Sequence, residues 1–106
     1  MLVAQSITSQ LIRSLRPVVV RLRGHNAGLA DQIVRAATSV ALNLAEGTRR
    51  TGRDQTRVFR IAAGEAQEVK AALQTAHDWG FVDDEVLTES RALADRVGAL
   101  TYGLAR

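Results

Sequence analysis

The sequence predicts an all-α protein, an antiparallel up-down-up-down four-helix bundle formed by one domain over residues 1–106. Three observations lead to this prediction. The length of 106 residues is that of one domain. One proline, no cysteine and only 4% aromatic residues favour helices over a β-sandwich or barrel. Finally, apolar residues recur every three or four positions in four successive segments, as they do on amphipathic helices.

The first predicted helix spans residues 4–23. Its apolar stripe has spacings of four and three and consists of Ile7, Leu11, Leu15, Val18 and Leu22. Pro17 lies inside the segment, where it removes one backbone hydrogen bond and is expected to bend the helix. Residues 24–28 contain two glycines and are expected to connect this helix to the next.

The second predicted helix spans residues 27–46, and we expect Gly47 to end it. One face is formed by Leu29, Ile33, Ala36, Ala37, Val40 and Leu44. A second apolar flank is formed by Val34, Ala41, Leu42 and Ala45. A helix that is apolar over so wide an arc requires burial on two sides, and a four-helix monomer offers only one. We therefore expect Val34 and Leu42 to contact another subunit.

The third predicted helix spans residues 53–79. Thr51 and Asp54 have the spacing of a capping box at its start. Gly64 lies in mid-helix, where glycine costs about 1 kcal/mol relative to alanine, and we expect close approach of another helix to compensate. Trp79 and His77 are expected to pack against the end of the bundle.

The fourth predicted helix begins near Asp83, a favourable N-cap residue, and acidic residues follow it in the first turn. Its apolar stripe consists of Val86, Leu87, Leu93, Val97, Leu100 and Leu104. Connectors of about three to seven residues join the four helices, as in up-down bundles with antiparallel neighbours. No apolar run is long enough to cross a membrane and no basic leader is recognisable, so we expect a cytoplasmic protein.

The residues that enzymes commonly use are sparse. The two histidines lie at positions 25 and 77, and neither belongs to the Glu-x-x-His motif of di-iron bundles. Glu65 and Glu68 lie one turn apart without a histidine, so they are a poor metal site. The segment 47–52 lacks the length and the lysine of a phosphate-binding P-loop. We expect a non-enzymatic protein with no cofactor and no bound metal.

Basic and acidic residues are distributed unevenly. Residues 1–60 contain ten arginines and three acids, a net charge of +7, whereas residues 61–106 contain four basic and eight acidic residues, a net charge of −4. A cluster of five arginines lies around the second connector: Arg49, Arg50, Arg53, Arg57 and Arg60. Guanidinium groups bind phosphate oxygens in pairs, so this arginine cluster fits a nucleic-acid backbone. The same side chains could instead contact a surface of another subunit.

A row of polar residues follows one face of the second predicted helix: Arg35, Ser39, Asn43 and Glu46. We expect Asn43 to be a buried amide that fixes the register between helices. Together with Gly47, these residues belong to the stretch from Gln32 to Gly47, which reads Q-I-V-R-A-A-T-S-V-A-L-N-L-A-E-G. This stretch closely resembles the signature of the proteins encoded in intervening sequences of bacterial 23S ribosomal RNA genes.

The resemblance covers most of the chain and continues through residues 53–68. It implies a left-handed up-down bundle that assembles into a homopentameric ring. Relatives include the accessory protein of diversity-generating retroelements, which partners a reverse transcriptase and uses a basic surface in the region of the arginine cluster. The sequence departs from the family at Glu65, where many members have a small hydroxyl residue. An acid at this position is suited to pairing with an arginine.

Two functions are compatible with these features. In the first, an oligomeric bundle binds the backbone of RNA or DNA, with RNA favoured, through the arginine cluster. In the second, the same ring docks a protein partner without nucleic acid, as an assembly or adaptor protein. The resemblance does not decide between them, because the biochemical role of the family is mostly unassigned.

Overall fold

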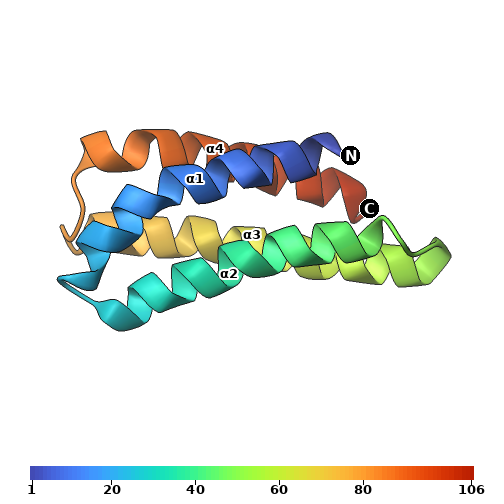
Figure 1. The fold of residues 1–106 in the computed structure, drawn as a ribbon, viewed down its shortest axis with the longest axis horizontal. Coiled ribbons are helices and arrows are strands. Elements are labelled where there is room, and N and C mark those ends of the chain that lie inside the picture. Colours follow the sequence, from blue (N-terminus) through green and yellow to red (C-terminus); the bar gives the residue numbers. More distant parts are fainter.

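Four antiparallel helices make up a computed structural model that describes all residues from 1 to 106. They are α1 (Val3–Arg23), α2 (Ala27–Gly47), α3 (Gly52–Asp78) and α4 (Asp84–Leu104). Each helix packs against two neighbours, so that α1 and α3 both contact α2 and α4 (Figure 1). The predicted all-α class and the four helices are confirmed. No helix has the length and apolar character needed to cross a membrane.

The core is built from the stripes that the helical periodicity predicts. Residues 7, 11, 15, 18 and 22 of α1 are all buried, and α1 runs unbroken through Pro17. The other three helices contribute large, fully buried side chains at Ile33, Val40, Leu44, Val69, Leu73, Leu87 and Val97. Buried hydroxyls are also satisfied, since Thr8 donates to the carbonyl of Ala4 and Thr101 to that of Val97. The bundle therefore has one continuous apolar centre.

The predicted N-cap positions of α3 and α4 are confirmed, but the predicted capping contacts are not formed. Asn26 caps α2, because its side-chain oxygen accepts a 2.9 Å hydrogen bond from the amide of Leu29. Thr51 and Asp83 occupy the N-cap positions of α3 and α4, yet neither side chain makes a capping hydrogen bond. The predicted capping box at Thr51 is therefore wrong. The carboxylate of Asp54 pairs with arginines instead.

Of two predictions about glycines, the one for Gly64 is wrong and the one for Gly47 is confirmed. Gly64 is exposed, and a Cβ added there would have nothing within 4 Å, so no helix approaches it closely in this chain. Gly47 ends α2 as predicted, with Thr48 as the C-cap, although it does not adopt a left-handed conformation. Its lack of a Cβ has another reason: the added atom would lie 2.3 Å from Cε1 of Phe59.

The two ends of the bundle are formed by different connectors. The chain termini and the α2–α3 connector lie at one end, and the α1–α2 and α3–α4 connectors lie at the other (Figure 1). The hairpin formed by α2 and α3 projects beyond the adjacent ends of α1 and α4 (Figure 1). The arginine cluster is placed on this projecting hairpin, and Trp79 lies at the opposite end.

Candidate nucleic-acid interface

The projecting hairpin is held in shape by residues on both of its helices. The ring of Phe59 on α3 is 5% exposed and packs against Gly47 at the end of α2. The side-chain amide of Gln55 donates 3.0 Å hydrogen bonds to the carbonyls of Gly47 and Arg50. Gly52 has a φ of +59°, a left-handed conformation that side chains disfavour. The connector is therefore a braced turn.

Two of the clustered arginines are engaged in ion pairs within the hairpin. Arg50 bridges two carboxylates, with Nη2 at 2.6 Å from Oε1 of Glu46 and Nη1 at 2.9 Å from Oδ2 of Asp54. Arg57 reaches the other oxygen of Asp54 at 3.0 Å. The hydrogen bond from Arg57, together with the charge of Arg50, lowers the pKa of Asp54 below its ordinary value. The hydrogen bond that Arg50 donates to Glu46, with the charge of Asp54, raises the pKa of Arg50.

The other three arginines are exposed and have no acidic partner. Arg49 and Arg53 make no ion pair and no side-chain hydrogen bond, while Arg60 donates a 3.3 Å hydrogen bond to the carbonyl of Ala105. Glu46 and Asp54 are the acids that pair within the cluster, so the five arginines leave a local charge of +3. Within the cluster, Glu46 and Asp54 thus neutralise Arg50 and Arg57, whereas Arg49 and Arg53 are available to an anion.

The polar row on α2 is connected to α3 through Arg35. Arg35 pairs with Glu65 at 3.3 Å and with Glu68 at 2.5 Å, both on α3. The side chain of Gln32 also donates to Glu68, at 3.1 Å. The expected pairing of Glu65 with an arginine is confirmed. The Arg35 hydrogen bond, followed by that from Gln32, lowers the pKa of Glu68.

Asn43 does not have the predicted role. It is half-buried, and its amide donates to the carbonyl and the hydroxyl of Ser39, at 2.9 and 3.1 Å, within the same helix. The contacts between α2 and α3 are instead made by the ion pairs of Arg35 and by the packing of Phe59 against Gly47. Sequence reasoning missed Phe59 and Gln55, although Phe59 is one of only two phenylalanines in the chain.

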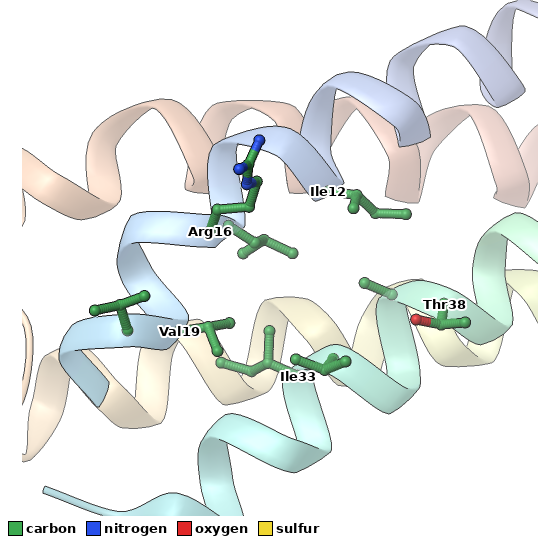
Figure 2. A pocket seen from close by; sticks show the side chains of 9 residues that line it. Ile12, Arg16, Val19, Ile33 and Thr38 are labelled. Atoms are coloured by element: carbon green, nitrogen blue, oxygen red, sulfur yellow. The ribbon is translucent and has the colours of Figure 1, made fainter. Parts of the chain in front are cut away.

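Val34 and Leu42, the residues expected at a subunit contact, are both exposed. Val34 is 43% exposed and Leu42 is 64% exposed, on the outer surface of α2. Val34 lines a groove of about 350 Å³ between α1 and α2, whose walls include Ile12, Val19 and Ile33 (Figure 2). Arg16 and Thr38 are the polar residues that line it. An exposed apolar groove of this kind marks a surface suited to contact another molecule.

Fold and surface together define an all-α bundle with a basic projecting hairpin and an apolar groove. The chain belongs to the 23S rRNA-intervening sequence protein family, whose sequence model matches residues 20–103. It is similar to the crystal structure of a protein with unknown function from the S23 ribosomal protein family of Bacteroides thetaiotaomicron. That similarity has a TM-score of 0.85 at 18% identity, over 98% of this chain and 99% of that chain. No functionally curated protein matches the sequence.

Proposed function

We propose that this protein is a non-enzymatic, oligomeric bundle that binds the sugar-phosphate backbone of nucleic acid, with RNA favoured, through the arginine cluster. The observation that carries the proposal is the pair of unengaged guanidinium groups, Arg49 and Arg53, on a braced hairpin that projects from the bundle. Because the hairpin is already ordered, binding a phosphate would cost little further ordering of the backbone.

The chemistry of the cluster favours backbone contacts over base recognition. Guanidinium groups offer paired donors that match phosphate oxygens. Phe59 is the aromatic residue within the cluster, and its ring is buried against Gly47, so it cannot stack on a base. Contacts to phosphates carry no sequence information directly. We therefore expect weak sequence preference and a strong dependence on salt concentration.

Salt dependence of RNA binding tests the proposal. Single-stranded RNA labelled with a fluorophore is titrated with nuclease-treated protein, and anisotropy is recorded at several salt concentrations. Affinity is expected to fall as salt rises. In the double variant Arg49→Gln/Arg53→Gln, the slope of log K against log salt should be shallower by about 1.4 for each protomer that contacts the RNA. Arg96→Gln removes another exposed, unpaired arginine, on α4, and serves as the control.

The outcomes of this experiment discriminate between the two candidate functions. Binding that is insensitive to salt, or equal in the double variant and in wild type, would contradict the role of the cluster. A protein that does not bind RNA at all would favour the adaptor function. In that case the triple variant Arg53→Glu/Arg57→Glu/Arg60→Glu should lose the oligomer, because the arginines would then contact a neighbouring subunit.

The oligomeric part of the proposal is supported by the α1–α2 groove and by Leu42. Burying an exposed leucine contributes about 1.5–3 kcal/mol, so repeated contacts through this surface would be substantial. The resemblance noted from the sequence implies five subunits. In such a ring each protomer would contribute one arginine hairpin, and several hairpins acting on one RNA would increase the overall affinity.

A further inference from the structure

Three aromatic rings stack at the end of the bundle opposite the arginine cluster. Phe81 is in the middle: its ring centroid lies 5.2 Å from that of His25 and 6.1 Å from that of Trp79, with interplanar angles of 12° in both pairs. His25 belongs to the α1–α2 connector, whereas Trp79 and Phe81 belong to the α3–α4 connector. We call these three residues the aromatic tip.

Trp79 leaves this stack open on its outer side. Phe81 packs against the core, but Trp79 is 71% exposed. Trp79 thus meets the end of the bundle, as expected, by stacking on Phe81, but it does not pack into it. Trp79 is the only tryptophan in the chain. An indole that lies nearly parallel to a neighbouring ring and is mostly open to solvent is an energetically favourable surface for a flat cation.

The surroundings of the aromatic tip are acidic. This end of the bundle has two arginines, Arg21 and Arg23, and five acids: Asp31, Asp78, Asp83, Asp84 and Glu85. With neutral histidines the net charge is −3. Arg23 is paired with Asp31, and His77 lies 2.6 Å from Asp84 and 3.4 Å from Asp78. Asp83 and Glu85 make no ion pair. The open indole thus lies in a region with surplus carboxylates.

The size of this end limits what can bind there. The bundle measures 22 × 18 Å across its long axis of 43 Å. A stable interface between folded proteins takes about 800 Å² of accessible surface from each partner, which is a broad contact for so narrow an end. A short linear segment requires far less surface. The negative charge selects a basic segment, and the flat open indole favours arginine over lysine, because a guanidinium is planar and more weakly hydrated.

We propose that the aromatic tip binds a short arginine-containing segment of another protein. One guanidinium stacks on the open face of Trp79, and the surplus carboxylates attract the neighbouring basic side chains. This surface is separate from the arginine cluster, so its role does not depend on the proposed binding of nucleic acid. The protein would then present two complementary ends, one for phosphates and one for a basic peptide.

The test uses the full chain after nuclease treatment and a fluorophore-labelled hexa-arginine peptide. Anisotropy measures binding, and the intrinsic fluorescence of Trp79 reports whether the peptide reaches the tip. We expect saturable binding with a matching change in Trp79 fluorescence, weaker binding of hexa-lysine and no change in Trp79 fluorescence with hexa-glutamate, whose negative charge suits the arginine cluster instead. Trp79→Ala should weaken binding about fivefold, as expected for the loss of one cation–π contact.

Matched variants separate the tip from general electrostatics. Tyr102→Ala removes the exposed aromatic residue at the other end of the bundle and should leave affinity unchanged. Asp83→Asn/Glu85→Gln should weaken binding, whereas Asp95→Asn, which removes an exposed acid elsewhere on α4, should not. Circular dichroism checks that each variant is folded. We expect Trp79→Ala to fold, because Trp79 is exposed.

Three results would overturn the proposal. The first is absence of hexa-arginine binding. The second is equal affinity in wild type and Trp79→Ala. The third is self-association, seen as a protein mass that grows with concentration in wild type but not in Trp79→Ala or in Arg49→Gln/Arg53→Gln. The occupant of the aromatic tip would then be the arginine hairpin of a second copy of this chain. Analytical ultracentrifugation over the concentration range of the titration detects that case.

Discussion

At the residue scale, the contact between Gly47 and Phe59 determines how closely α2 and α3 meet at the hairpin. A methyl group on Gly47 would lie 2.3 Å from the ring of Phe59, a distance at which something must move. The ring is 5% exposed and belongs to the core, so it cannot simply rotate into solvent. The close packing of α2 and α3 at the hairpin therefore requires a residue without a Cβ at position 47.

Gly47→Ala and Gly64→Ala should therefore have opposite effects on stability. We expect Gly47→Ala to lower the free energy of unfolding by about 1–3 kcal/mol through overpacking. Gly64→Ala should raise it by about 0.5–1 kcal/mol, because Gly64 is exposed in mid-helix and an added Cβ meets nothing. Urea unfolding measures both changes. Destabilisation by Gly64→Ala would reveal a second subunit packed against that face of α3.

At the element scale, α2 and α3 are joined along their outer surface by charge. Arg35 and Gln32 on α2 both contact Glu68 on α3, and Arg35 also contacts Glu65. These side chains are exposed or partly buried, so each pair contributes modestly to stability. They connect the two helices whose adjacent ends form the arginine hairpin.

The stability of this contact should depend on pH in the acidic range. The pKa of Glu68 is lowered from its ordinary value of 4.5, chiefly by the hydrogen bond from Arg35, so the folded state favours the charged carboxylate. The resulting stabilisation is fully present above pH 4.5, the unfolded-state value, and is lost as pH falls through the folded-state pKa. The melting temperature of wild type should therefore fall on acidification below this value.

A variant of Glu68 isolates its share of this dependence. Glu68→Gln should start from a lower melting temperature at neutral pH and lose less of it on acidification. Some loss should remain, because the pKa values of Asp54 and Asp78 are also lowered. Glu89→Gln removes an exposed glutamate of α4 that makes no ion pair, and it should follow wild type. Parallel acid losses in Glu68→Gln and wild type would contradict the assignment.

The elements themselves were predictable from sequence, but their contacts were less so. The α1 stripe of Ile7, Leu11 and Leu15 has a helical period that depends only on neighbouring residues, and it is buried as predicted. The role of Gly64 and the location of Trp79 depend on which surfaces meet in three dimensions. Sequence reasoning placed both against other elements, and the structure leaves both exposed. The pairing of Glu65 with an arginine was predicted from the resemblance to the family and is present in the structure.

At the scale of the whole molecule, the bundle is a rod with two charged ends and an apolar side. The arginine cluster and the acidic surroundings of the aromatic tip are separated along the 43 Å axis. The groove between α1 and α2 and the exposed Leu42 lie along the side of the rod. Side-by-side association would cover the apolar surface and leave both ends open, so that the proposed oligomer could still present its arginine clusters to nucleic acid.

Leu42→Lys tests this arrangement because Leu42 is 64% exposed and lies outside the core of the single chain. A lysine there should leave the helical content and the fold of the protomer intact. At a subunit contact, however, it would bury an ammonium group without a partner, which is costly enough to dissociate the oligomer. Native mass spectrometry should then change from the mass of several chains, five by family resemblance, to that of one.

Thr88→Lys is the matched control, since it adds the same charge at an exposed position of α4 and should leave the assembly intact. A Leu42→Lys protein that remains oligomeric would show that Leu42 faces solvent in the assembly. A wild type that is monomeric would contradict the side-by-side ring. The RNA titration would then still test the arginine cluster, but the gain in affinity from several hairpins would be absent, because the avidity requires linked copies.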